Sequence, residues 1–202
     1  MRLATLGIMA GALASCVSVS SSSVADRAGL PPDFDASPVM VWFPVEDMAT
    51  LTASEERFLE EADRRGGTAI AGSDALSPDR EHSASELAGA ARGTGAATIL
   101  VVSVRSGRDS MVPPNTQESC IQRNAEGVCR PTVGGTSIPR SVPGKLVLEF
   151  TLFDTTSESS IWRATVVTTD KAGASTSVDL VERAMEEAVK RLTEDGLLPG
   201  RS

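Results

Sequence analysis

The run of residues 98–104, Thr-Ile-Leu-Val-Val-Ser-Val, restricts the possible folds of this chain more than any other segment. Apolar and β-branched residues follow one another without alternating with polar ones, which is typical of a strand buried on both faces. Such a strand belongs inside a sheet that has helices packed against it. The run therefore predicts a protein of the α/β class, with this strand near the centre of the sheet.

Four further segments have strand patterns. Residues 39–43 form a short apolar run, and residues 68–71 form a weaker one. Residues 145–153 and 161–167 alternate between apolar and polar side chains, as expected of antiparallel strands with one face toward solvent. The polar stretch between these last two segments is short enough for a hairpin.

Three segments have helix signals. Thr52 and Glu55 have the spacing of a capping box, which predicts a helix that begins there and ends at two glycines, and Ser83 and Glu86 repeat this spacing before a shorter Ala-rich helix. Ser177 is the predicted cap of a last helix, which carries an apolar stripe on one face. On the other face, Glu186 with Lys190 and Glu187 with Arg191 are predicted to pair at a spacing of four.

Together these signals predict one α/β (α+β) domain over residues 38–198. The predicted order is strand, helix, strand, helix, strand, strand, strand, helix. Parallel strands need crossover connections and antiparallel strands need only short turns, so this order gives a mixed sheet of about five strands with helices packed on it.

The N-terminus is organised like an export signal. Arg2 precedes the apolar run 3–13, which is too short to cross a bilayer as a helix, and small residues follow it. Residues 13–16, Leu-Ala-Ser-Cys, resemble the lipobox of bacterial lipoprotein precursors. The resemblance implies that residues 1–15 are removed as a signal peptide and that Cys16 receives the lipid.

A second cleavage site competes with the first. Residues 23–25, Ser-Val-Ala, have the small-x-small pattern of ordinary signal peptide cleavage, which would discard Cys16 and release a soluble secreted domain. If the lipobox is used instead, the Ser-rich residues 16–37 are expected to form a flexible tether between the membrane and the domain.

Composition and single residues argue against several functions. The chain has a net charge of −8, 3% aromatic residues and no Tyr, so it lacks the basic surface and the stacking side chains of nucleic-acid-binding proteins. Its one imidazole, His82, is expected in an exposed loop, which leaves no serine triad and too few ligands for a metal. We therefore expect neither an enzyme nor a cofactor, with a small-ligand-binding or hydrolytic domain as the alternative.

The insert at residues 105–144 separates the central strand from the alternating ones. It is rich in Pro and Gly, and Cys120 and Cys129 form an even pair that an oxidising compartment would allow to close as a disulfide. Five Arg against three acidic residues give the insert a charge of +2. The candidate partner-binding residues are these arginines and one late Trp: Arg105, Arg108, Arg123, Arg130, Arg140 and Trp162. The alternative is a variable, solvated loop.

Three segments carry a further resemblance: residues 39–44, residues 95–101, and the turn after Asp154 that leads to residues 161–163. They resemble a group of periplasmic domains that includes the N-terminal domain of the Tol system propeller protein, the curli secretion pore lipoprotein and lipoprotein activators of penicillin-binding proteins. The resemblance and the lipobox together imply a lipid-anchored protein of the cell envelope, in the outer membrane and facing the periplasm, which acts as an adaptor for an envelope protein.

Overall fold

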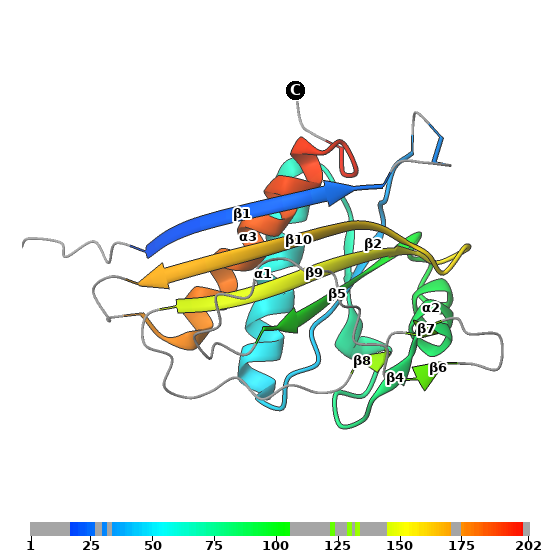
Figure 1. The fold of residues 1–202 in the computed structure, drawn as a ribbon, viewed down its shortest axis with the longest axis horizontal. Coiled ribbons are helices and arrows are strands. Elements are labelled where there is room, and N and C mark those ends of the chain that lie inside the picture. Colours follow the sequence, from blue (N-terminus) through cyan, green and yellow to red (C-terminus); the bar gives the residue numbers. More distant parts are fainter. Residues whose placement is uncertain are drawn as a thin grey trace, which may run out of the picture.

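The fold is built around one mixed sheet, whose strand order is β1-β10-β9-β5-β2-β3 (Figure 1). The computed structural model describes residues 17–26, 30–31, 34–105, 145–170 and 175–199, together with the backbone of three short strands between residues 122 and 133. The sheet strands are β1 (Val17–Ala25), β2 (Val39–Trp42), β3 (Ala69–Ala71), β5 (Thr98–Val104), β9 (Lys145–Asp154) and β10 (Ser160–Asp170). The predicted α/β (α+β) class is confirmed.

The central position predicted for residues 98–104 is also confirmed. Strand β5 pairs in parallel with β2 and antiparallel with β9, and β9 continues into the hairpin with β10. The short β3 pairs in parallel with the outer side of β2. The parallel strands thus occupy one half of the sheet and the antiparallel strands the other.

Three helices pack on this sheet: α1 (Met48–Arg65), α2 (Ala84–Gly93) and α3 (Ser177–Glu194). The capping box at Ser83 is present as predicted. Helix α1 begins one turn earlier than predicted, because Asp47 and not Thr52 caps it, and it ends at Gly66 with a φ of 91°. Helix α3 is capped by Thr176, one residue before the predicted position.

The helices cover opposite faces of the sheet. Alternate residues of a strand point to opposite sides, and in β2 the side chains of Val39 and Val41 join the large core under α1 and α3. Met40 and Trp42 point the other way and pack with Leu87 and its neighbours on α2. Trp42 and Trp162 are both fully buried.

The prediction of a flexible tether is wrong for residues 17–25, which form β1. All nine residues pair antiparallel with β10, from Val17 opposite Asp170 to Ala25 opposite Trp162. Ser18, Ser20 and Ser22 are exposed on one face of this edge strand, while Val17 and Ala25 on the other face pack against the core. The main sheet therefore has six strands, one more than predicted.

The prediction of an exposed loop for His82 is also wrong. His82 belongs to the short strand β4 (His82–Ser83), which pairs with β8 (Thr132–Val133), and its side chain is buried. Its ring meets that of Trp42 edge to face, with 5.6 Å between the ring centres. Two more short strands, β6 (Gln122–Arg123) and β7 (Cys129–Arg130), pair with each other inside the insert, and a short 3-10 helix η1 (Gly72–Asp74) follows β3.

Candidate functional site

An open groove of about 660 Å3 lies on the surface of the described part of the chain. Helices α1 and α3 provide most of its lining, and Val17 and Val19 at the start of β1 complete it. The lining contains five basic and five acidic side chains: Arg57, Arg64, Arg65, Arg183 and Lys190, and Glu61, Asp179, Glu182, Glu186 and Glu187. The groove is therefore a charged surface, and it reaches the first residue of the edge strand.

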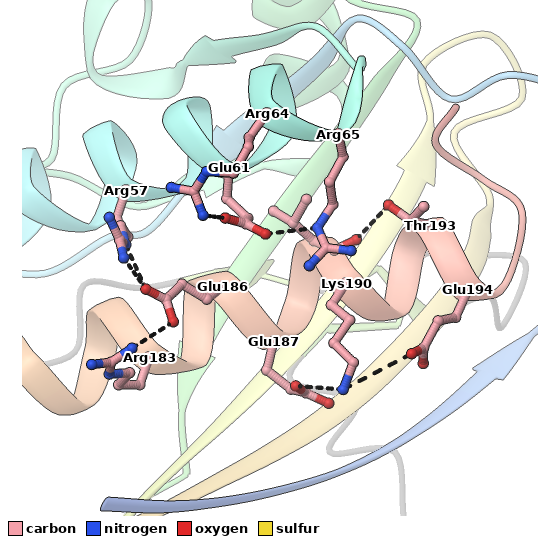
Figure 2. A network of polar contacts seen from close by, with 11 residues as sticks. Arg57, Glu61, Arg64, Arg65, Arg183, Glu186, Glu187, Lys190, Thr193 and Glu194 are labelled. Atoms are coloured by element: carbon pink, nitrogen blue, oxygen red, sulfur yellow. Dashed lines mark hydrogen bonds and ion pairs between the residues drawn. The ribbon is translucent and has the colours of Figure 1, made fainter. Parts of the chain in front are cut away.

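Glu186 connects the two helices (Figure 2). Its carboxylate accepts from the Nε of Arg57 on α1 at 2.8 Å and from Arg183 on its own helix at 3.0 Å. Partial burial raises the pKa of Glu186, but the hydrogen bonds from Arg57 and Arg183 outweigh it and hold the pKa below its usual value. The predicted pair of Glu186 with Lys190 does not form, because Glu186 faces α1 instead.

Glu61 repeats this arrangement on α1. It accepts from Arg64 and, at 2.7 Å, from the Nε of Arg65. Only 5% of the Glu61 side chain is exposed, whereas 59% of Arg64 is exposed. The carboxylate thus lies in the floor of the groove and the guanidinium lies at its rim.

Glu187 links α3 to the edge strand. It accepts from the hydroxyl of Ser21 at 2.6 Å, and it pairs with Lys190 and Arg191 at 3.3 and 3.1 Å. The pair with Arg191 was predicted from the spacing of four. Partial burial opposes ionisation, yet the contacts with Ser21 and the two cations leave the pKa of Glu187 lowered.

Asp195, just after α3, binds both the edge strand β1 and its neighbour β10. One of its oxygens, Oδ2, accepts from the indole Nε1 of Trp162 on β10 and from the hydroxyl of Ser23 on β1, each at 2.7 Å. The indole of Trp162 is only 1% exposed. Trp162 therefore packs in the core of this structure and offers little exposed surface to a partner.

A second polar cluster lies at the carboxyl ends of β2 and β3. Burial raises the pKa of Glu55, although the backbone and hydroxyl of Ser73 and the backbone of Gly72 donate to its carboxylate. Nearby, the Nε2 of His82 lies 2.8 Å from the carbonyl oxygen of Ser77. A side chain at Gly72 would collide with the backbone of Val41. These contacts hold the turn after β3 against β2, so the cluster is structural.

The other candidate residues lie at or beyond the limit of the described chain. Arg105 directly follows β5, and its exposed side chain pairs with Glu149 of β9 at 3.1 Å. Arg123, Cys129 and Arg130 lie in the backbone pair β6 and β7. The predictions for Cys16, Arg108, Cys120 and Arg140 fall outside the described residues, and the disulfide and the lipid attachment stay predictions.

Neither a metal site nor a membrane-crossing helix emerges from the part of the chain that the structure describes. No three His, Cys, Asp or Glu side chains are grouped there so that they could hold an ion. No helix among the described residues combines the length and the hydropathy needed to cross a bilayer.

Comparisons with known proteins give a fold-level similarity. No protein-family model and no curated protein matches the chain. Among solved structures, the chain is similar to the PelC dodecamer from Paraburkholderia phytofirmans, with 13% identity and a TM-score of 0.48 over 87% of this chain and 97% of the other. A variant of the same dodecamer gives 14% identity and a TM-score of 0.47 over 91% of this chain and all of the other.

Proposed function

We propose that this protein is a lipid-anchored protein of the cell envelope, held by Cys16 in the outer membrane and facing the periplasm. The observation that supports the lipobox over the competing cleavage site is strand β1. Cleavage after Ala25 would remove all nine residues that pair with β10, including the two serines that bind Glu187 and Asp195. Cleavage before Cys16 leaves the strand complete.

If Cys16 carries the lipid, the position of β1 brings the domain close to the membrane. Val17, the first residue of β1, follows Cys16 directly. With a lipid on Cys16, the end of the sheet that contains Val17 would lie at the bilayer surface, without the tether that the Ser-rich sequence suggested.

The Arg-rich insert begins and ends at this end of the sheet, although its strand β8 pairs with β4, which directly precedes α2. Arg105, where the insert begins, donates its backbone N–H to Val147 of β9 at 3.0 Å. Lys145, where the insert ends, lies opposite Thr169 of β10, and the neighbouring Asp170 lies opposite Val17. The insert therefore leaves and re-enters the domain on the side of the proposed anchor.

The protein is proposed to work there as a non-enzymatic adaptor. The carboxylates of Glu61, Glu186 and Glu187 in the groove are each paired with cations, which supports a structural role for them. The arginines of the insert remain the proposed contacts for an envelope protein. Anchoring raises the local concentration, so a weak interface of this kind can still be occupied.

Fatty-acid labelling tests the anchor. We expect radiolabelled palmitate to mark the wild-type protein and to be absent from the Cys16→Ala variant. Cys120→Ser provides the matched control, because it removes a thiol from the insert and should keep the label. An unlabelled wild-type protein in cells that export it would contradict the proposal.

Crosslinking in intact cells tests the adaptor role. Photoreactive residues placed at Arg123 and Arg130 should capture one specific envelope protein, whereas a probe at Glu182 on α3 should not capture it. Failure of both insert positions to capture any specific protein would count against an adaptor.

A further inference from the structure

The groove between α1, α3 and β1 differs from the rest of the protein in its charge. The whole chain carries a net charge of −8, but the groove is lined by equal numbers of basic and acidic side chains. This face is thus less negative than the protein as a whole, which reduces its repulsion by an anionic surface.

The charges on this face are also separated by depth. The side chains of Arg64 and Arg183 are 59% and 56% exposed. Their carboxylate partners Glu61 and Glu186 are 5% and 22% exposed. An approaching surface therefore meets these cations before it meets the carboxylates that they pair with.

The arrangement of the pairs leaves donors available to a further acceptor. Glu61 is shared by Arg64 and Arg65, and Glu186 is shared by Arg57 and Arg183. A guanidinium has five N–H donors, so a partner carboxylate does not use them all. Phosphate groups are suited to such guanidinium groups.

The groove lies beside the proposed point of attachment. Val17 lines it, and Val17 follows Cys16, the residue proposed to carry the lipid. A face that begins one residue from the lipid cannot lie far from the headgroups of the membrane that holds it.

We infer that the groove formed by α1, α3 and the start of β1 is the surface that this protein turns toward the membrane, where its exposed cations contact the phosphates of anionic phospholipid headgroups. The inference rests on the proposed anchor at Cys16. It adds an orientation: the opposite side of the sheet, which carries α2, faces away from the bilayer. The headgroup contact is electrostatic, so salt weakens it, while the lipid keeps the protein attached.

Arginine footprinting tests this orientation with the full chain. The protein is purified from cell envelopes in detergent and incorporated into vesicles of phosphatidylcholine, with or without phosphatidylglycerol. Phenylglyoxal then modifies accessible arginines, and mass spectrometry gives the rate at each. We expect Arg64 and Arg183 to react severalfold more slowly on the phosphatidylglycerol vesicles, and this difference to disappear at about 1 M salt.

Arg80 and Arg92 serve as internal controls, since they lie on the α2 side and are 58% and 48% exposed. Their rates should be the same on both kinds of vesicle. Equal rates for Arg64 and Arg183 on both vesicles, or slower reaction of Arg80 and Arg92 instead, would overturn the orientation while leaving the anchor intact. Protein that does not float with either vesicle would overturn the anchor and the orientation together.

A pair of double variants tests the role of charge. The variant R64Q/R183Q leaves Glu61 with Arg65 and Glu186 with Arg57, so no groove carboxylate loses all its partners. In this variant, the protection of Arg65 by phosphatidylglycerol should be lost. In the charge-matched variant R80Q/R92Q it should persist, and its loss there would contradict a specific face.

Discussion

Ser21 of the edge strand donates a hydrogen bond of 2.6 Å to Glu187 of the last helix, so that β1 is attached to α3 as well as to β10. Arg191 donates to the same hydroxyl at 2.7 Å. Two residues further along β1, Ser23 binds Asp195. The Ser-rich sequence of this segment resembles a linker, but two of its serines, Ser21 and Ser23, attach it to the domain.

Removal of β1 should destabilise the domain. A chain that begins at Asp26 exposes the edge of β10 and loses the pairing of nine residues, and we expect its free energy of unfolding to fall by about 3 kcal/mol or more relative to a chain that begins at Val17. Urea unfolding of the two chains measures the difference. Equal stability would mean that β1 is dispensable and would remove the main argument against cleavage after Ala25.

Substitution of single serines should show that the two faces of β1 contribute differently to stability. Ser21→Ala removes the contact with Glu187 and should cost about 1 kcal/mol. Ser20→Ala changes an exposed side chain of the same strand and should alter stability by less than about 0.5 kcal/mol. Thermal unfolding compares the two variants, and similar losses from both would contradict the proposed attachment.

The indole N–H groups of the two tryptophans should differ in their contribution to the free energy of unfolding. Trp162→Phe removes a donor to the carboxylate of Asp195, and it should cost about 1 to 3 kcal/mol more than Trp42→Phe does. The Nε1 of Trp42 is buried and contacts no acceptor among the described residues, so its loss removes an unsatisfied donor. Chemical unfolding of both variants gives the comparison, which is wrong if Trp42→Phe is the more damaging change.

Glu55 should make the stability of the domain fall as the pH rises. Burial raises the pKa of Glu55 above the usual glutamate value of 4.5, so the folded protein holds this proton more tightly than the unfolded chain does. Its contribution to stability is therefore complete below about pH 4.5 and declines as the pH rises through the raised value. Glu55→Gln cannot titrate, so unfolding curves from pH 4 to 7 should show the variant gaining stability relative to wild type as the pH rises. A constant difference would contradict this.

Most of the sheet could be predicted from local patterns. Burial can be predicted from the uninterrupted apolar run at residues 98–104 and from the alternation in residues 145–153. Both strands lie where these patterns predict them. The capping box at Ser83 is equally local, because its two residues contact each other. The start of helix α1 was predicted one turn too late, because the prediction relied on the capping-box spacing of Thr52 and Glu55. The structure shows that Asp47 caps the helix instead.

What could not be predicted depends on contacts between distant segments. Strand β1 exists because β10, far along the chain, offers an edge to it, and no local pattern shows this. His82 is buried because Trp42 and the insert strand β8 pack on it. The groove depends on the pair of Arg57 with Glu186, residues that are 129 positions apart. Each helix shows its charges in the sequence, but only the packing of α1 beside α3 brings them together.

The most direct test of the central claim is the mass of the mature N-terminus. Intact-protein and N-terminal peptide mass spectrometry of the protein taken from the cell envelope should show a chain that begins at Cys16 and carries the added mass of diacylglycerol, with Val17 next in sequence. A chain that begins at Asp26, or one that still begins at Met1, would contradict the proposed anchor.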